Sequence, residues 1–393
     1  MPTLFLVYEW PKCRGLVLFG GILSPTRRKI ILQNTALILA SLVFSFIAIE
    51  IGFRLLDPTP YFSDAEINNT EHGNLSVFDE MLGWKGAPGG SEVFVTRNNR
   101  VQLSHNSQGF RDIEHSPGGR NAPAIVFLGD SFTWGYEVEF DQMFVNRLRG
   151  SFPQYEIFNL AHRGYGTDQS FLTFKKWSTN RTLGLVVLMF SENDNGDNNA
   201  IVNYRKAKPR FEIRNNKLAL TGVPILHRDS WPETNSSNEE DDKEPFREAL
   251  KTFFYSSHFF NNMRVRNKLY RNRKESEQAA EAAAQRPESE RDYALTARIL
   301  EELRKEVTRR GSRLVVVFIP SKREIDQLDD SKPYQSEIAT VCEELGITYF
   351  DLAPALMQSS FRTYYPQGMH WNARGHALTA VALETFLSQQ LTP

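Results

Sequence analysis

The sequence has few of the residues from which several classes of site are built. Its 393 residues include two cysteines, Cys13 and Cys342. Two cysteines cannot form a disulfide scaffold or a cysteine zinc site. Charge of one sign is also missing, because 46 basic residues are balanced by 47 acidic ones and the net charge is -1. A chain with no overall basic field is poorly suited to nucleic acid, so we expect no nucleic-acid partner.

Most of the chain also lacks long polar tracts. Residues of the AVILMFWYC set make up 41% and charged residues 24%, so most of the chain should fold around a core. The exception is the range from about 203 to 290, which holds an acidic stretch at 233–244 and an Ala/Glu/Gln-rich run at 275–290. We interpret this range as an insertion in the folded domain, with the acidic stretch as a solvated loop.

One long hydrophobic run is present, from Ile30 to Phe53. At about 1.5 Å per residue it would span roughly 36 Å, enough to cross a hydrocarbon core of about 30 Å. A buried core helix and a cleaved signal peptide are the alternatives. The run is long for a signal peptide, and no A-x-A cleavage site follows it before Asp57. The run is therefore predicted to be an uncleaved, single-pass transmembrane anchor.

Basic residues are distributed unequally around this run. Five precede it, namely Lys12, Arg14, Arg27, Arg28 and Lys29, whereas Arg54 alone follows it among residues 54–80. The positive-inside rule then places the N-terminus in the cytoplasm. The predicted organisation is a cytoplasmic tail at 1–29, the anchor at 30–53, a lead-in segment at 54–121 and a periplasmic or extracellular domain at 122–393. On this topology Cys13 and Cys342 lie on opposite sides of the membrane and cannot pair.

Short β-rich runs alternate with helix-like stretches through the rest of the chain. The runs are Ala124–Leu128, Tyr155–Leu160, Leu185–Phe190, Arg313–Ile319 and Ile347–Asp351, each bounded by turn residues. The helix-like stretches are 167–180, 289–310, 335–345 and 373–390. Alternation of this kind predicts an α/β fold, a doubly wound parallel sheet of five strands with helices on both faces.

Polar residues suited to catalysis follow these runs. Ser131 comes just after the first, Gly164 after the second and Asn193 after the third, and His370 follows the last. Ligands of a doubly wound sheet bind beyond the carboxyl ends of its strands. A hydroxyl nucleophile, a glycine N–H, an amide and an imidazole at one sheet edge are the groups that acyl transfer needs.

These motifs resemble those of the SGNH (GDSL-type) hydrolases. The resemblance rests on Gly129-Asp130-Ser131, on Gly164 five residues after Asn159, on Asn193-Asp194 and on His370. It implies the flavodoxin-like fold of that family, Ser131 as nucleophile, His370 as base, and Gly164 and Asn193 as oxyanion donors. It also implies no cofactor and no metal. The motifs Leu82-Gly83-Trp84 and 106–112 are similar to those of the membrane-anchored bacterial branch.

Two positions depart from the family pattern. Ser191 stands where the family has Gly, and Gln367 occupies the place of the acid in the family's Asp-x-x-His block. Gln367 could accept a hydrogen bond from His370 Nδ1 but would bring no charge. Three functions stay open: an esterase acting on O-acylated carbohydrate or lipid, an O-acetyltransferase modifying a cell-surface polysaccharide, and a non-catalytic binding module. Pro320-Ser321-Lys322 is similar to a motif of the alginate O-acetyltransferase branch.

Each candidate residue also has a purely structural interpretation. Ser131 could cap a helix, Gly164 and Asn193 could form turns, and His370 could be a core histidine. For the neighbouring polar residues we expect His162 to line the site, His376 to pack in the core, Asp130 to hold a turn, and Asp194 and Asp197 to lie in a solvated loop rather than bind metal. Protein partners cannot be predicted from the sequence.

Overall fold

The computed structural model describes residues 24–56, 75–96, 98–116, 122–178, 181–204, 206–226, 293–326 and 333–391, with residues 257, 259, 260 and 263. The chain divides into two units, Met1–Asp57 and Pro58–Pro393. Most of the predicted insertion lies outside the described residues, and so do Cys13 and most of the predicted tail.

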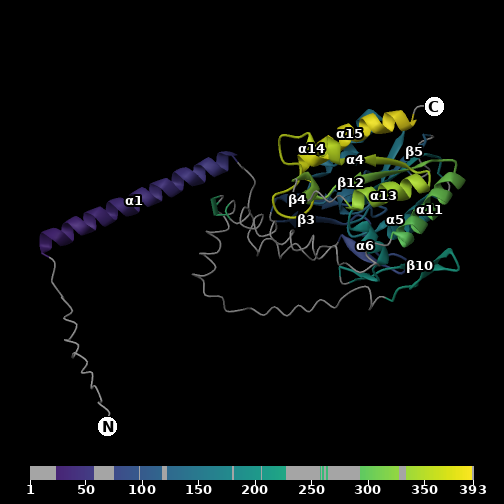
Figure 1. Ribbon diagram of the computed structural model, residues 1–393, viewed down its shortest axis with the longest axis horizontal. Coiled ribbons are helices and arrows are strands. Elements are labelled where there is room, and N and C mark those ends of the chain that lie inside the picture. The colour runs from purple at the N-terminus through teal and green to yellow at the C-terminus, as the bar shows by residue number, and fades with distance from the viewer. Residues whose placement is uncertain are drawn as a thin grey trace, which may run out of the picture. The chain divides into compact units, whose positions relative to one another are not determined.

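The first unit contains one long helix, α1, from Pro25 to Leu56 (Figure 1). Its stretch Thr26–Leu55 has a mean hydropathy of 2.3. By length and composition α1 is able to cross a membrane, and a signal sequence near the N-terminus has the same properties. The predicted anchor at 30–53 lies entirely within this helix.

The second unit is built on a five-stranded parallel sheet in the order β13-β12-β7-β5-β6. The strands are β5 (Ala124–Leu128), β6 (Glu156–Asn159), β7 (Leu183–Ser191), β12 (Leu314–Ile319) and β13 (Thr348–Asp351). The predicted α/β fold is confirmed. The chain runs from β5 to β6 on one side and then returns to β7 on the other side of β5. The carboxyl ends of β5 and β7 therefore flank the point at which doubly wound sheets bind ligands.

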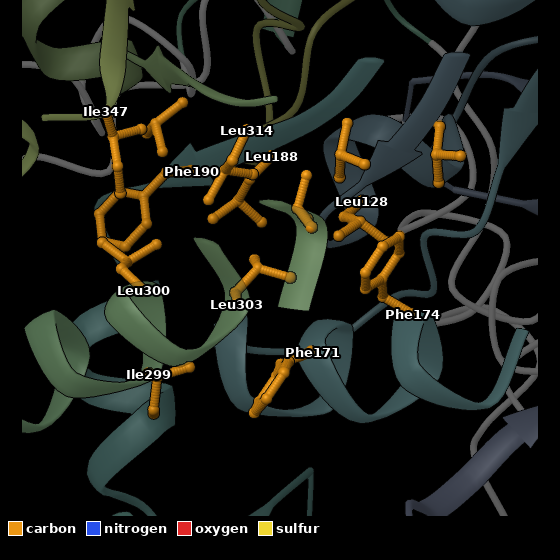
Figure 2. Packing of buried hydrophobic residues seen from close by; sticks show 14 of the residues in the cluster. Leu128, Phe171, Phe174, Leu188, Phe190, Ile299, Leu300, Leu303, Leu314 and Ile347 are labelled. Carbon is orange, nitrogen blue, oxygen red and sulfur yellow. The ribbon is translucent and has the colours of Figure 1, made fainter. Parts of the chain in front are cut away.

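Both faces of the sheet are buried. Side chains point alternately to one face and the other along each strand. Val126, Leu188 and Phe190 pack into one apolar cluster, whereas Phe127, Val187 and Met189 pack into the other. Helices α5 (Thr167–Trp177), α11 (Ala294–Arg309) and α13 (Pro333–Glu344) cover the first face, as Figure 2 shows for α5 and α11. Helices α4 (Phe144–Ser151), α14 (Ala353–Met357) and α15 (Ala373–Leu391) cover the second face (Figure 1).

The lead-in segment contributes two β-hairpins that the sequence analysis missed. They pair β1 (Ser76–Asp79) with β2 (Gly83–Gly86) and β3 (Ser91–Val95) with β4 (Arg100–Ser104). Phe94, Val101 and Leu103 of the second hairpin form an apolar cluster with Trp134 and Ala161, which lie beyond the ends of β5 and β6. The lead-in is thus packed against the edge of the sheet that carries the candidate site.

The remaining elements are short and lie in the connections. They are α3 (Ser131–Trp134), η1 (Phe140–Gln142), α6 (Asp194–Asn199), β8 (Val202–Asn203), β9 (Lys206–Ala207), β10 (Arg210–Arg214), β11 (Lys217–Thr221) and α12 (Lys322–Ile325). Strands β10 and β11 form a hairpin at the start of the predicted insertion.

Candidate active site

Ser131 lies directly after β5, on a tight turn into the short helix α3. Gly129 enters this turn with φ 150°, and a Cβ there would lie 2.5 Å from Thr133 Oγ1, so the turn has no room for a side chain. Asp130 caps α3 by accepting a hydrogen bond from the Phe132 N–H at 2.9 Å. The cap is therefore Asp130 and not Ser131, whose hydroxyl is left for other contacts.

The structure brings His370 to Ser131. Oγ of Ser131 lies 2.8 Å from Nε2 of His370, a hydrogen-bond distance between residues 239 positions apart. His370 is carried on the segment between α14 and α15. Lys322 Nζ holds that segment by donating to the Tyr365 carbonyl at 2.7 Å and to the Pro366 carbonyl at 2.8 Å. Lys322, from the Pro320-Ser321-Lys322 motif, thus holds the loop that carries His370.

The other ring nitrogen of His370 faces a residue that the sequence analysis missed. Nδ1 lies 3.7 Å from Oε2 of Glu137, whose side chain is almost fully buried. Gln367 is instead fixed through its main chain, since its N–H and its carbonyl both bond to the Asn98 side chain, at 3.3 and 2.6 Å. The interpretation of Gln367 as the residue that orients His370 stays a prediction, and among the described residues its side chain has no hydrogen bond to His370 to support it.

Gly164 lies in the loop after β6, and Asn193 lies just after the end of β7. Gly164 has φ 78°, and a Cβ there would lie 2.6 Å from Cε2 of Tyr204, so a side chain at this position would strain the loop and displace the tyrosine. Asn193 Nδ2 donates to Asp197 Oδ2 at 2.8 Å. That bond turns one of the two amide hydrogens of Asn193 toward Asp197.

The C-terminal part of the chain matches a protein-family model. Residues 273–393 match the family described as "ALGX: SGNH hydrolase-like domain, acetyltransferase AlgX". This part of the chain is similar to the SGNH hydrolase-like domain of that family. The matched range holds β12, β13 and His370, and it begins after Ser131. The resemblance to SGNH hydrolases is confirmed, whereas membership of the membrane-anchored bacterial branch stays a prediction. No curated protein matches the chain by sequence.

Several solved structures are similar to the chain. A member of the lipolytic protein G-D-S-L family from Veillonella parvula DSM 2008 is 13% identical, with 68% of this chain and 99% of that chain covered and a TM-score of 0.36. The lipase/acylhydrolase from Enterococcus faecalis is 12% identical, with 69% and 98% covered and a TM-score of 0.38. The psychrotrophic esterase EstA from Pseudoalteromonas sp. is 9% identical, with 68% and 98% covered and a TM-score of 0.35.

Ser191, the first departure from the SGNH pattern, joins two buried carboxyl groups. Its Oγ lies 2.9 Å from Asp130 Oδ2, 2.8 Å from Asn193 Oδ1 and 3.0 Å from Asp194 Oδ2. One hydroxyl hydrogen cannot serve three acceptors. Burial, and then the charge of Asp130, raise the pKa of Asp194 well above its usual range. The expected solvated loop is therefore wrong, because Asp194 is 1% exposed.

The other two histidines of interest in the SGNH domain are buried. His162 packs among the rings of His105, Trp134 and Tyr165 instead of lining the site, and burial lowers its pKa well below the usual range. His376 stacks on Phe144, and burial lowers its pKa to about 3, which fits the predicted packing role. Among the described residues, no group of three or more His, Cys, Asp or Glu side chains is arranged to hold a metal ion.

Proposed function

We propose that the SGNH domain is a serine esterase that cleaves O-acyl esters, acetyl esters first among them. The observation that carries the proposal is the 2.8 Å contact between Ser131 Oγ and His370 Nε2. His370 takes the hydroxyl proton as Ser131 Oγ forms a bond to the ester carbonyl carbon. The same proton then passes to the departing alkoxide oxygen as its bond to carbon breaks. This leaves an acyl group on Ser131, which water removes in a second round with His370 again as base.

We assign the oxyanion of the tetrahedral intermediate to the N–H groups of Ser131 and Gly164 and to the Asn193 amide. Within the residues that the structure describes, neither of the two N–H groups donates a hydrogen bond, so both can serve a ligand. Asn193 still has a second amide hydrogen beside the one given to Asp197. Fixed donors of this kind contribute several orders of magnitude to acyl transfer.

A second candidate function is transfer of an acetyl group to a hydroxyl of a cell-surface polysaccharide. The family description, which names an acetyltransferase, favours it. The first half of the reaction is unchanged. In the second half a sugar hydroxyl, instead of water, attacks the acetyl group on Ser131 and gives its proton to His370. The substrate in either case is an O-acylated carbohydrate or lipid, and no cofactor is needed.

The proposed location follows from α1, as an uncleaved anchor with the N-terminus in the cytoplasm and the SGNH domain outside. Support comes from the basic residues before the apolar run and the acidic residues after it. A domain held at a membrane surface on its outer side meets cell-surface glycans and lipids and not cytoplasmic esters.

The reaction is tested on the full chain in detergent, with 4-nitrophenyl acetate and an alkyl phosphonate probe. We expect hydrolysis above the rate in buffer and a phosphonate adduct on Ser131, located by mass spectrometry. Ser131→Ala should lose both, because it removes the hydroxyl that lies 2.8 Å from His370 Nε2. Ser388→Ala, an exposed serine on α15, is the matched control and should keep both.

Two results would count against the esterase. Activity that persists in Ser131→Ala would show that another residue carries the reaction. A wild-type chain that neither hydrolyses the ester nor reacts with the probe would favour the binding module. Addition of an unacetylated polysaccharide separates the two enzymatic candidates, because a transferase moves the acetyl group to the sugar at the expense of free acetate.

A further inference from the structure

The SGNH domain has no carboxylate at position 367, yet the structure places a carboxylate beside His370. We propose that Glu137, held by Asn98 of the lead-in hairpin, does the work of the missing acid: it orients His370 and stabilises the imidazolium formed when Ser131 loses its proton. The inference rests on the proposed serine-esterase function. It makes Glu137 a positioning residue, which acts through His370 and not on the substrate.

The two nitrogens of the His370 ring have separate partners. Nε2 lies 2.8 Å from Ser131 Oγ, and Nδ1 lies 3.7 Å from Glu137 Oε2. A carboxylate on the Nδ1 side favours the tautomer that carries its hydrogen there, which leaves Nε2 free to accept the serine proton. The 3.7 Å separation is an ion-pair distance, and contacts of this kind shorten when substrate is bound.

Asn98 controls the direction of the Glu137 carboxylate. Its Nδ2 donates to Glu137 Oε1 at 2.8 Å, which leaves Oε2 for His370. The same amide group bonds to the Gln367 carbonyl at 2.6 Å, and Asn98 Oδ1 accepts from the Gln367 N–H at 3.3 Å. The buried Asn98 side chain therefore links the turn that carries Glu137 to the loop that carries His370. In this arrangement Gln367 contributes through its main chain, so the loss of an acid at this position does not disturb the link.

The backbone at Glu137 is also held in an uncommon conformation. Its φ is 65°, in the left-handed region that favours glycine. A residue keeps such a conformation only where its surroundings enforce it. The Glu137 carbonyl accepts from Asn99 Nδ2 at 2.5 Å and from Tyr365 Oη at 2.8 Å. The guanidinium of Arg111 bonds to the carbonyls of Gly135 and Val138, one on each side of the turn.

These contacts make the lead-in a part of the active site. Asn98 and Asn99 lie at the tip of the β3–β4 hairpin. Arg111 lies in the motif at 106–112, which follows β4 in the sequence. Phe94 and Val101 of the hairpin pack on Trp134 at the end of α3, which fixes the hairpin against the turn. A lead-in that only linked an anchor to the domain would not need these bonds.

Other charges near His370 do not replace Glu137. Asp130 lies close enough to interact with the His370 charge, but its oxygens bond to the Phe132 N–H and to Ser191 Oγ, and burial raises its pKa. The buried His376 and the Arg111 guanidinium bring no negative charge. Within the described ranges, Glu137 is the carboxylate within ion-pair distance of His370 Nδ1.

The test compares variants of the full chain in ester hydrolysis over pH 5 to 9. Glu137→Gln keeps the size of the side chain and removes its charge. We expect kcat/KM to fall roughly 100-fold or more, by analogy with the loss of charge in a serine-protease triad. Glu137→Asp keeps the charge on a shorter side chain and should retain more activity than Glu137→Gln. Glu139→Gln, two residues further along the same turn, is the matched control and should stay within about 2-fold of wild type.

Two further measurements separate an electrostatic role from a merely structural one. In Glu137→Gln the pH–rate profile should differ in shape from that of wild type, because the side chain that lies 3.7 Å from His370 Nδ1 no longer carries a charge. Gln367→Asp should add no activity to the wild-type chain. In the Glu137→Gln background it should restore about 10-fold, since a carboxylate three residues before His370 supplies the charge from the other side.

The inference is overturned if Ser131→Ala is inactive while Glu137→Gln keeps wild-type activity and the wild-type pH profile. It is also overturned if Glu137→Gln loses activity with an unchanged shape of the pH–rate profile and no recovery on Gln367→Asp, since the glutamate would then be only structural. Failure of the proposed function looks different. Ser131→Ala would keep activity, or the wild-type chain would not react with the phosphonate.

Discussion

Ser191 lies between two buried carboxyl groups next to the candidate site, those of Asp130 and Asp194. Its hydroxyl lies within hydrogen-bond distance of Asp130, Asn193 and Asp194, and all three distances are 3.0 Å or less. A glycine here, as in the SGNH pattern, would leave Asp130 Oδ2 without this donor. The Ser191 hydroxyl, at the end of β7, therefore serves the carboxyl group that Asp130 brings to the turn between β5 and α3.

Replacing this serine should destabilise the fold. Ser191→Ala removes the donor and leaves buried acceptors unpaired, so we expect the free energy of unfolding to fall by about 1–3 kcal/mol. Urea denaturation followed by tryptophan fluorescence measures the change. Ser388→Ala, on the exposed face of α15, should stay within about 0.5 kcal/mol of wild type. Equal stability of Ser191→Ala and wild type would show that the hydroxyl is not an essential donor.

Helix α6 places a second acid in a partly desolvated position. Asp197 accepts from Asn193 Nδ2 at 2.8 Å and from Asn203 Nδ2 at 3.0 Å, and thereby links α6 to β8. Burial raises the pKa of Asp197 from 3.8 to about 6. The folded protein therefore holds this proton more tightly than the unfolded chain does, and the associated stability is lost as the pH rises through about 6.

The stability of the protein should record this titration. The free energy of unfolding of wild type, relative to Asp197→Asn, should decrease between about pH 4 and pH 7, by at most about 3 kcal/mol. Thermal or urea denaturation at several pH values measures the slope. When Asp197→Ala replaces Asp197→Asn as the reference, the difference in the free energy of unfolding from wild type should change with pH in the same way, because alanine also lacks the charge. Its absolute size should differ. A constant difference over this range would contradict the raised pKa.

We expect the part of the chain that carries Ser131 and His370 to lie outside the cytoplasm, with α1 as its membrane anchor. Helix α1 has the length and hydropathy of a membrane span. A phosphatase reporter that folds only outside the cytoplasm, fused after Pro393, should be active, and a cytoplasmic reporter at the same position should be inactive. The positive-inside rule gives the physical reason.

Protease added to intact spheroplasts offers an independent measurement of the same topology. It should digest the SGNH domain and leave a cytoplasmic control protein intact. Replacing the basic residues that precede the apolar run by neutral ones should reduce the fraction of the domain that the protease can reach. The residues to replace are Lys12, Arg14, Arg27 and Arg28. Full protection of the wild-type domain in intact spheroplasts would reverse the proposed orientation.

The sheet and the central pair of the site could be predicted because their signals are local. A parallel strand buried on both faces is a continuous apolar run, and the five predicted runs coincide with β5, β6, β7, β12 and β13 to within a few residues. Strand ends of a parallel sheet meet at one edge, so the residues that follow them are neighbours whatever their separation in sequence. That is why Ser131 and His370 could be paired from the sequence. The hairpins of the lead-in were missed because each of their strands is only four or five residues long and contains polar or charged residues.

The identity of the carboxylate beside His370 was decided only in three dimensions. Glu137 reaches the ring because its backbone adopts φ 65° and because Asn98, 39 residues earlier, turns its carboxylate. Asn98 in turn bonds to Gln367, 269 residues later. A conformation of this kind is locally unfavourable and is stabilised by contacts between segments distant in the sequence, so no local sequence pattern predicts it. The apolar runs of the sequence determined the sheet and the meeting of Ser131 with His370, while the packing of the lead-in on the strand ends decided which charge supports them.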